Sequence, residues 1–179
     1  MISEVRRTIP TVRFSLDEAQ KAEDEWRFNC GPGALCAILG KTPDEIRPFL
    51  GDFETKKYMS PSMMKGFFLA TGYKFTWNVI PYTIPPMNLW KHNSLIRVQW
   101  AGPWTEAGAY PIAKSRHTHW IGCKHVWGAE VHIFDINAMC VGGWMPLSEW
   151  EGQLVPWLLS ECEPKADGRW WQTHIVEVL

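Results

Sequence analysis

The sequence predicts an α+β protein whose first half is mainly helical and whose second half forms antiparallel strands. Helix-start signals at Ser15, Thr42 and Ser60 each precede a segment with helical character. The later part of the chain instead has short runs of β-branched and aromatic residues bounded by turn residues. At 179 residues the chain fits a single domain, with a helical part over about 15–72 and a sheet part over about 73–179.

Capping residues position the individual helices. Ser15-Leu-Asp-Glu18 and Thr42-Pro-Asp-Glu45 are capping boxes, in which the outer side chains satisfy free N–H groups at a helix start. Gly40 and Gly72 suit the position that follows a helix. These signals predict helices from Ser15 to about residue 24, over 30–39, from Thr42 to about Leu50, and over 62–71.

The second half is expected to contain strands and one further helix. The strands are predicted over 73–80, 94–100, 118–125, 130–136 and 170–178. Pro-rich residues 81–86 are expected to form a connection, and Gly128 a turn. The segment 147–160 has a helical pattern that we expect to be interrupted or bent near Pro156.

Charge and hydropathy narrow the classes of function. The net charge is −1, and the 18 basic residues are scattered, which argues against nucleic acid or an anionic membrane as the main partner. No apolar run is long enough for a transmembrane helix, and the N-terminus lacks the apolar core of a signal peptide. We therefore expect a cytoplasmic protein. Five cysteines without a regular spacing argue against a disulfide framework.

One of these cysteines, Cys30, is expected at the N-terminus of the helix over 30–39, directly after Asn29. Pro32 fits the first turn of that helix, where a missing N–H costs no intrahelical hydrogen bond. A helix N-terminus carries partial positive charge and free N–H groups, which lower the pKa of a thiol and can receive an oxyanion. Cys30 is thus a candidate nucleophile, whereas Cys36 is expected in the core.

A base for this thiol can come from the predicted strands. If 118–125 and 130–136 form a hairpin centred on Trp127, His119 faces Asp135 at the open end of the apolar side of the hairpin. A carboxylate in that position can fix the tautomer of the imidazole and stabilise its charged form. The spacing alone therefore predicts a His–Asp pair.

An alternative pair lies one step further out. In the same hairpin His117 would face Asn137, and these residues could also serve as base and orienting residue. We prefer His119 because Trp120 follows it within the strand, whereas His117 lies in the approach to the strand.

A metal site is a further alternative, because imidazole with thiolate suits zinc. The residues that share one face of the strand are His117, His119, Cys123 and His125. The outer two would lie about 26 Å apart at ~3.3 Å per residue, too far for one ion. We therefore expect no metal. The remaining histidines, His92, His132 and His174, are expected to be structural or exposed.

The segment Asn-Cys-Gly-Pro-Gly-Ala-Leu over 29–35 resembles the nucleophile motif of papain-like cysteine peptidases. It is most similar to the peptidase domains of bacteriocin-exporting transporters. His119-Trp-Ile and Phe134-Asp135 also match those families in order and type. The resemblance implies a papain-like fold, with helices packed on an antiparallel sheet. It also implies a Cys30–His119–Asp135 triad that cleaves peptide or isopeptide bonds through a thioester.

The oxyanion hole departs from the pattern of those families, which place a glutamine donor shortly before the nucleophile. Here Asp24 occupies that position, and an ionised carboxylate cannot donate a hydrogen bond. The nearest preceding glutamine is Gln20. The oxyanion would then be bound by the Cys30 N–H together with Asn29, Gln20 or Trp26.

The sequence leaves other functions open for the same site. The chemistry could instead deamidate glutamine or transfer acyl groups, because the acceptor depends on the cleft. A catalytically inactive papain-like binding protein is another alternative, since the tryptophan-rich second half could form an interface. Trp120 and Trp144 are candidates for the walls of a substrate cleft. The expected partner is a protein or peptide, and no cofactor is expected.

Overall fold

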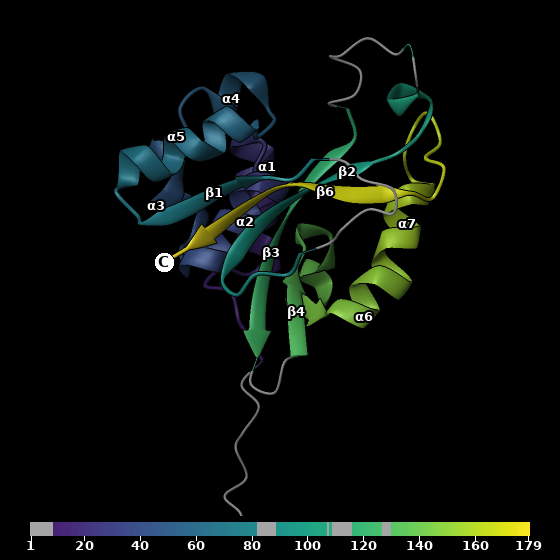
Figure 1. The fold of residues 1–179 in the computed structure, drawn as a ribbon. Coiled ribbons are helices and arrows are strands. Elements are labelled where there is room, and N and C mark those ends of the chain that lie inside the picture. Colours follow the sequence, from purple (N-terminus) through teal and green to yellow (C-terminus); the bar gives the residue numbers. More distant parts are fainter. Residues whose placement is uncertain (1–8, 82–88, 107, 109–115, 127–129) are drawn as a thin grey trace, which may run out of the picture.

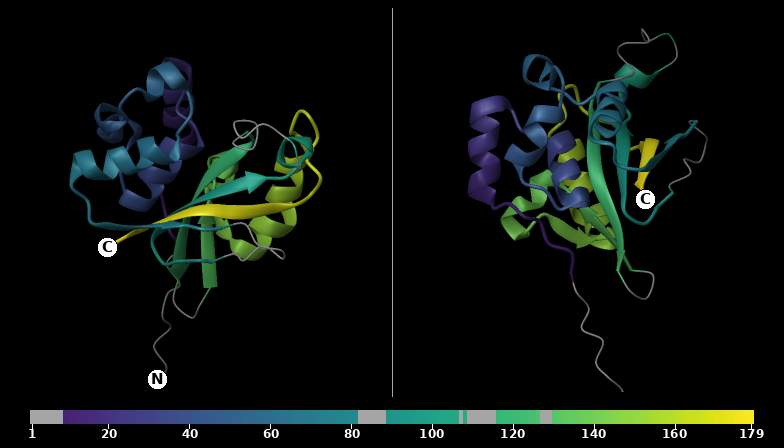
Figure 2. Two further views of the ribbon diagram at one scale, coloured as in Figure 1. Left: turned by 45° about the horizontal axis from the view of Figure 1, so that its top comes forward. Right: turned by 90° about the vertical axis from the view of Figure 1, so that its left-hand side faces the viewer.

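The computed structural model describes residues 9–81, 89–106, 108, 116–126 and 130–179. Within these residues the chain is an α+β protein built on one antiparallel sheet, which confirms the predicted class (Figure 1). Helices from the first half pack on one face of the sheet, and a helical segment near the C-terminus packs on the other (Figure 2). None of the helices in the described part is long and apolar enough to cross a bilayer.

The helical elements of the first half are α1 (Leu16–Trp26), α2 (Cys30–Leu39), α3 (Pro43–Ile46), η1 (Arg47–Phe49, a 3-10 turn), α4 (Phe53–Lys56) and α5 (Pro61–Thr71). Four of them, α1, α2, α3 and α5, begin where the sequence predicts, whereas the helix predicted from Thr42 to about Leu50 is divided into α3 and η1, and α4 was not predicted. The side chains of Ser15, Thr42 and Ser60 accept hydrogen bonds from backbone N–H groups in the first turns of α1, α3 and α5. Gly40 and Gly72 end α2 and α5 in the left-handed conformation, as expected.

The sheet has the strand order β1-β6-β2-β3-β4-β5, and neighbouring strands are antiparallel. The strands are β1 (Phe75–Val79), β2 (Ser94–Trp100), β3 (Thr118–Val126), β4 (Glu130–Phe134), β5 (Trp144–Pro146) and β6 (Trp170–Val178). Every residue of β2 is buried, because this strand lies inside the sheet and is covered on both faces. The predicted turn at Gly128 and most of the predicted connection over 81–86 lie outside the described residues.

The register of the β3–β4 hairpin is two residues away from the expected one. Cys123 pairs with Ile133, so the hairpin is centred one residue beyond Trp127. The shift arises because the last pair before the connection is formed by Val126 and Glu130. Since side chains alternate between faces with a period of two, the shift keeps each side chain on its expected face.

The predicted helix over 147–160 is present but changes pitch. It consists of α6 (Leu147–Glu149), a π-helical segment η5 (Trp150–Leu154) and α7 (Val155–Ser160). The irregularity precedes Pro156, because proline has no N–H to donate to the carbonyl of Gly152 in the preceding turn. A wider turn accommodates the missing hydrogen bond.

Side chains that alternate along the strands pack into two hydrophobic cores, one on each face of the sheet. Leu95, Trp120, Phe134 and Val176 pack with the helices of the first half. Ile96, Ile121, Ile133 and Ile175 pack with residues of η5 and α7. A side chain in the sheet therefore faces either the α2 layer or the α7 layer, and its parity in the strand decides which.

The helix α2 lies close to β3 at Gly122, the last residue of β3 that is paired with β4. β4 ends at Phe134, which pairs with Gly122, while β3 extends on to Thr118. A Cβ at Gly122 would lie 3.2 Å from Ile38 of α2, so the glycine permits the close approach of helix and strand. The N-terminus of α2 thereby reaches the uncovered end of β3.

Candidate active site

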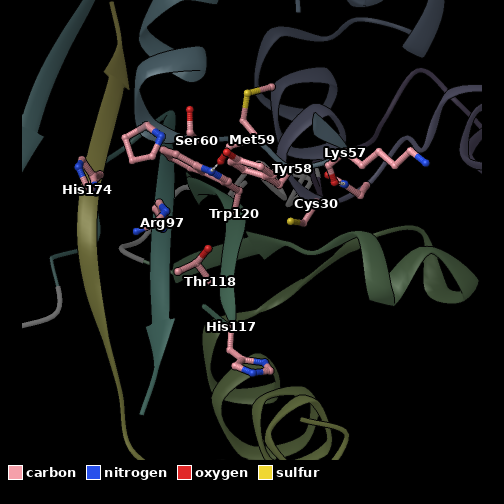
Figure 3. A pocket seen from close by; sticks show the side chains of 12 residues that line it. Cys30, Lys57, Tyr58, Met59, Ser60, Arg97, His117, Thr118, Trp120 and His174 are labelled. Atoms are coloured by element: carbon pink, nitrogen blue, oxygen red, sulfur yellow. Dashed lines mark hydrogen bonds between the residues drawn. The ribbon is translucent and has the colours of Figure 1, made fainter. Parts of the chain in front are cut away.

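Cys30 is the first residue of α2, as the sequence predicts. Asn29 caps the helix, and its Oδ1 accepts a hydrogen bond from the N–H of Gly31 at 3.3 Å. As the first residue of the helix, Cys30 has an N–H without an intrahelical partner. Its thiol is half-buried and lines a cleft (Figure 3), whereas the Cys36 thiol is buried in the core.

His119 comes from the uncovered end of β3, and Asp135 follows the last residue of β4. The Nε2 atom of His119 lies 2.8 Å from Oδ2 of Asp135. The side chains of His119 and Cys30 are neighbours that shift each other's pKa. Because Nε2 is occupied by Asp135, the nitrogen that faces Cys30 is Nδ1. Three distant segments thus bring together the residues that the sequence singled out.

Asp135 is completely buried and is held at both carboxylate oxygens. Besides His119, Oδ2 accepts a hydrogen bond from Nε1 of Trp150 at 2.9 Å. Oδ1 accepts hydrogen bonds from the backbone N–H and the side-chain amide of Asn137, at 3.0 and 2.9 Å. A buried carboxylate with four donors is stabilised in its charged form and fixed in orientation.

The three groups shift one another's pKa. Burial raises the pKa of the Cys30 thiol, but the charge of His119 and hydrogen bonds from His119 and from the N–H of Trp120 bring it below the ordinary value. Burial lowers the pKa of His119, but the charges of Asp135 and Cys30 and its hydrogen bonds to both raise it well above the ordinary value. These directions favour a thiolate paired with an imidazolium.

The pKa of Asp135 completes the arrangement. Burial raises it, but the charge of His119 and the hydrogen bonds from His119, Trp150 and Asn137 outweigh burial and lower the pKa below its usual range. The three pKa shifts together favour a charged Asp135, a charged His119 and a charged Cys30.

A cleft of about 700 Å³ opens beside Cys30, between the N-terminus of α2, the segment 57–61 and the sheet (Figure 3). Trp120 lines it as expected, and its Nε1 donates a hydrogen bond to the carbonyl of Met59 at 2.9 Å. A Cβ at Gly31 would lie only 2.4 Å from Cβ of Met59. Glycine at this position therefore lets the wall of the cleft close against α2.

The three side chains proposed as oxyanion donors are each placed differently. Asn29 lies in the cleft, but its amide donates to the carbonyl of Lys57 at 3.2 Å. Gln20 lies on the exposed side of α1 and donates to Asp24 at 3.1 Å. Trp26 is buried in the helical core, with an Nε1 that has no hydrogen-bond partner among the described residues. The structure leaves the Cys30 N–H as the donor best placed for an oxyanion.

The structure does not bring the alternative pair together. His117 lies at the rim of the cleft with its ring against Trp104, at 4.2 Å between ring centroids. Asn137 instead donates to Asp135. The expectation that Trp144 walls the same cleft is wrong, because its β5 position places it against Phe134 and beside a separate groove.

The metal alternative gains no support from the positions of its residues. The described part of the chain contains no group of three or more histidine, cysteine, aspartate or glutamate side chains that could hold an ion. His125 interacts with the carbonyl of Trp90 at 3.0 Å. Burial raises the pKa of the Cys123 thiol to about 12, which disfavours the thiolate that a metal requires.

Sequence reasoning missed three residues of the site. Trp150 could not be identified from the sequence, because the residues around it in the chain do not distinguish it from the other tryptophans. Arg97 also lines the cleft, and its signal is a lone charge inside the apolar run Leu95-Ile96-Arg97-Val98. His174, expected to be structural or exposed, is half-buried and lies in the cleft beside Arg97.

Comparisons with known proteins identify no relative: no protein-family model matches the chain, and no curated protein has a matching sequence.

Proposed function

We propose that this protein is a papain-like cysteine peptidase, a thiol hydrolase of peptide or isopeptide bonds. The observation that carries the proposal is the chain of contacts from Cys30 through His119 to Asp135. A thiol at a helix N-terminus, an imidazole and a buried carboxylate form a nucleophile, a base and an orienting residue. Their order along the chain and the helix-on-sheet arrangement support the papain-like assignment.

In the first half of the proposed reaction, the Cys30 thiolate attacks the carbonyl carbon of the substrate. The C=O electrons move onto oxygen, and the oxyanion accepts a hydrogen bond from the Cys30 N–H. As the C–N bond breaks, Nδ1 of the His119 imidazolium donates its proton to the leaving amine. A thioester on Cys30 and a free amine result.

In the second half, neutral His119 takes a proton from water through Nδ1, and the water oxygen attacks the thioester carbon. The C–S bond breaks, the carboxylic acid leaves, and the thiolate–imidazolium pair is restored. Asp135 keeps its charge throughout, and its hydrogen bond from Nε2 holds the ring so that Nδ1 faces the thiol.

The activation of Cys30 can be tested without knowing the substrate. Alkylation by iodoacetamide is followed at each cysteine by mass spectrometry, as a function of pH, in the wild type and in His119→Ala. We expect an apparent pKa for Cys30 below ~8.5 that rises when His119 is removed. Cys140, an exposed thiol of the same chain, is the internal reference. An ordinary, slow Cys30 that His119→Ala leaves unchanged would contradict the proposal.

Turnover separates the hydrolase from its alternatives. The protein is incubated with a mixed peptide library, and products are compared with those of Cys30→Ala. New peptide termini that depend on Cys30 support a peptidase, and conversion of glutamine to glutamate without chain cleavage indicates a deamidase. A reactive Cys30 with no product of either kind points to an inactive binding protein.

A further inference from the structure

Three side chains form a row across the sheet on the face that borders the cleft. Arg97 in β2 pairs with Trp120 in β3 on one side and with His174 in β6 on the other. Residues that pair directly across antiparallel strands point to the same face, so all three line the cleft, as Figure 3 shows. Arg97 is in the centre of this row, and Trp120 lies between it and Cys30.

The guanidinium of Arg97 is buried without a carboxylate partner among the described residues. Arg97 is 8% exposed, and its Nη1 donates to Oγ1 of Thr173 at 3.1 Å. Its Nε has no hydrogen-bond partner, and its Nη2 has none within the described residues. No carboxylate of the described part lies within ion-pair distance of it. Outside that part, the only acidic residue in the sequence is Glu4.

The described lining of the cleft supplies no carboxylate for this charge either. Among the described residues, the cleft is lined by Lys57, Arg97, His117 and His174 and by no aspartate or glutamate. Burial, and then the charge of Arg97, lower the pKa of His174 to about 4, so this histidine is neutral near pH 7. Burial lowers the pKa of Arg97 as well, and the charge of Cys30, which acts in the opposite direction, does not outweigh burial.

A buried charge without a partner is costly for the folded protein. A carboxylate is the ligand that matches it best, because the planar guanidinium offers two parallel N–H groups to two carboxylate oxygens. The same chain shows this geometry elsewhere, where Nε and Nη2 of Arg47 bind both oxygens of Glu54 at 2.8 and 3.1 Å. In Arg97 the corresponding edge is the one without a partner.

We propose that Arg97 binds a carboxylate of the substrate, so that the cleft selects a peptide with a negative charge close to the bond that Cys30 attacks. This inference rests on the proposed function of Cys30 for its substrate, but the binding of the carboxylate itself does not. Two sources supply the same chemistry: an acidic side chain, or the α-carboxylate at the end of a peptide.

The test measures how small carboxylates protect Cys30 from iodoacetamide. N-acetylglutamate α-amide carries only a side-chain carboxylate, N-acetylglutamine only an α-carboxylate, and N-acetylglutamine α-amide no charge. The apparent Kd of each follows from the alkylation rate of Cys30 against probe concentration, with Cys140 as the reference. We expect one charged probe to bind about ten- to a hundredfold more tightly than the neutral one. The tighter of the two charged probes identifies the source.

Two variants localise the effect. Arg97→Met removes the guanidinium and keeps an unbranched apolar side chain, and it should abolish the difference between charged and neutral probes. Lys57→Met, which removes another cation of the cleft, should retain most of it. Melting temperatures verify that each variant folds. If Arg97→Met does not fold, equal protection by the three probes in the wild type still overturns the proposal, and a probe difference that Lys57→Met retains excludes Lys57 as its source.

The outcomes separate this inference from the proposed function. Equal protection by charged and neutral probes overturns the role of Arg97, even if Cys30 proves activated and peptides are cleaved. Selective protection that depends on Arg97 supports it, even if Cys30 shows an ordinary pH dependence and no turnover. In that second case the cleft is a binding site for acidic peptides, and the catalytic proposal alone fails.

Discussion

His119 and Asp135 meet diagonally across the end of the β3–β4 hairpin, with Nε2 and Oδ2 2.8 Å apart. This contact directs Nδ1 toward Cys30, and Asp135 is itself held by Trp150 and Asn137. Asp135 therefore affects the pKa of the Cys30 thiol mainly through His119. Removing parts of this arrangement one at a time gives separable effects.

Replacing the carboxylate by an amide should weaken the thiolate. In Asp135→Asn, His119 loses the neighbouring charge that raises its pKa, so less imidazolium is present to stabilise Cys30. Asp135 also raises the pKa of Cys30 directly, but this is the smallest of the causes that act on the thiol. The pKa of Cys30 should rise, and alkylation near pH 6.5 should slow by about tenfold or more.

The matched control for that variant is Asn137→Ala. It removes the side-chain hydrogen bond to Oδ1 and leaves the carboxylate charge and its contact with His119 in place. Its alkylation profile should stay close to that of the wild type. If Asp135→Asn and Asn137→Ala slow alkylation equally, a general loss of order rather than the charge of Asp135 is responsible.

Trp150→Phe should lower the free energy of unfolding. The variant keeps most of the buried ring but removes the N–H that donates to Asp135 at 2.9 Å, and a hydrogen bond to a charged group contributes about 1.5–3 kcal/mol. Urea unfolding at pH 7 measures the loss. Trp157→Phe, at a half-exposed tryptophan of α7, should change stability by less than about 0.5 kcal/mol.

The same comparison has a predicted pH dependence. The folded pKa of Asp135 is lowered, so the stability it contributes is present above its unfolded pKa of about 3.9 and is lost as pH falls through the folded pKa. The difference between Trp150→Phe and the wild type should therefore narrow below about pH 3.9. A difference that stays constant down to acid unfolding would mean that ring packing, not the hydrogen bond, is lost.

Gly31→Ala should disrupt the wall of the cleft. The added Cβ would lie 2.4 Å from Cβ of Met59, so helix and loop must separate, at a cost of about 1–3 kcal/mol. Because Trp120 donates to the carbonyl of Met59, the separation should also be visible as a change in tryptophan fluorescence. Gly66→Ala in α5, with open space around its Cβ, should instead stabilise by about 0.5–1 kcal/mol.

Most helices and strands were predictable because their signals are local, whereas the short elements α4 and β5 were not predicted. Ser15, Thr42 and Gly40 act through hydrogen bonds or backbone angles within a few residues, and the structure confirms them. The register of β3 and β4 was wrong by two residues, yet His119 and Asp135 still meet. The face of the sheet on which a side chain lies depends only on whether its position in the strand is odd or even, so a register shift of two residues leaves it unchanged.

The remaining features of the site arise from contacts that no local pattern encodes. Trp150 donates a hydrogen bond to Asp135 from a π-helical segment on the face of the sheet opposite α2. Trp144 does not line the cleft, because β5 forms the edge of the sheet opposite β1. Arg97 and His174 are 77 positions apart, but β2 and β6 pair directly and bring them together. Strand order, which the sequence does not reveal, decides these neighbours.

That pairing makes His174 a sensor of the charge on Arg97. Burial is the main cause that lowers the pKa of His174 to about 4, and the charge of Arg97 is the second. In Arg97→Met the pKa should rise part of the way toward 6.5, because burial remains. Lys57→Met should leave it near 4. NMR titration of the imidazole measures each value.

A bound carboxylate should raise the pKa of His174, as Arg97→Met should. It neutralises Arg97, so a saturating charged probe should raise the pKa of His174 in the wild type, and the neutral probe should not. Because the folded pKa of His174 lies below its unfolded value, stability is lost as pH falls from 6.5 to about 4. Arg97→Met should reduce this loss. A His174 pKa that neither the probe nor Arg97→Met changes would mean that the guanidinium is screened from the cleft, and the carboxylate must then bind elsewhere.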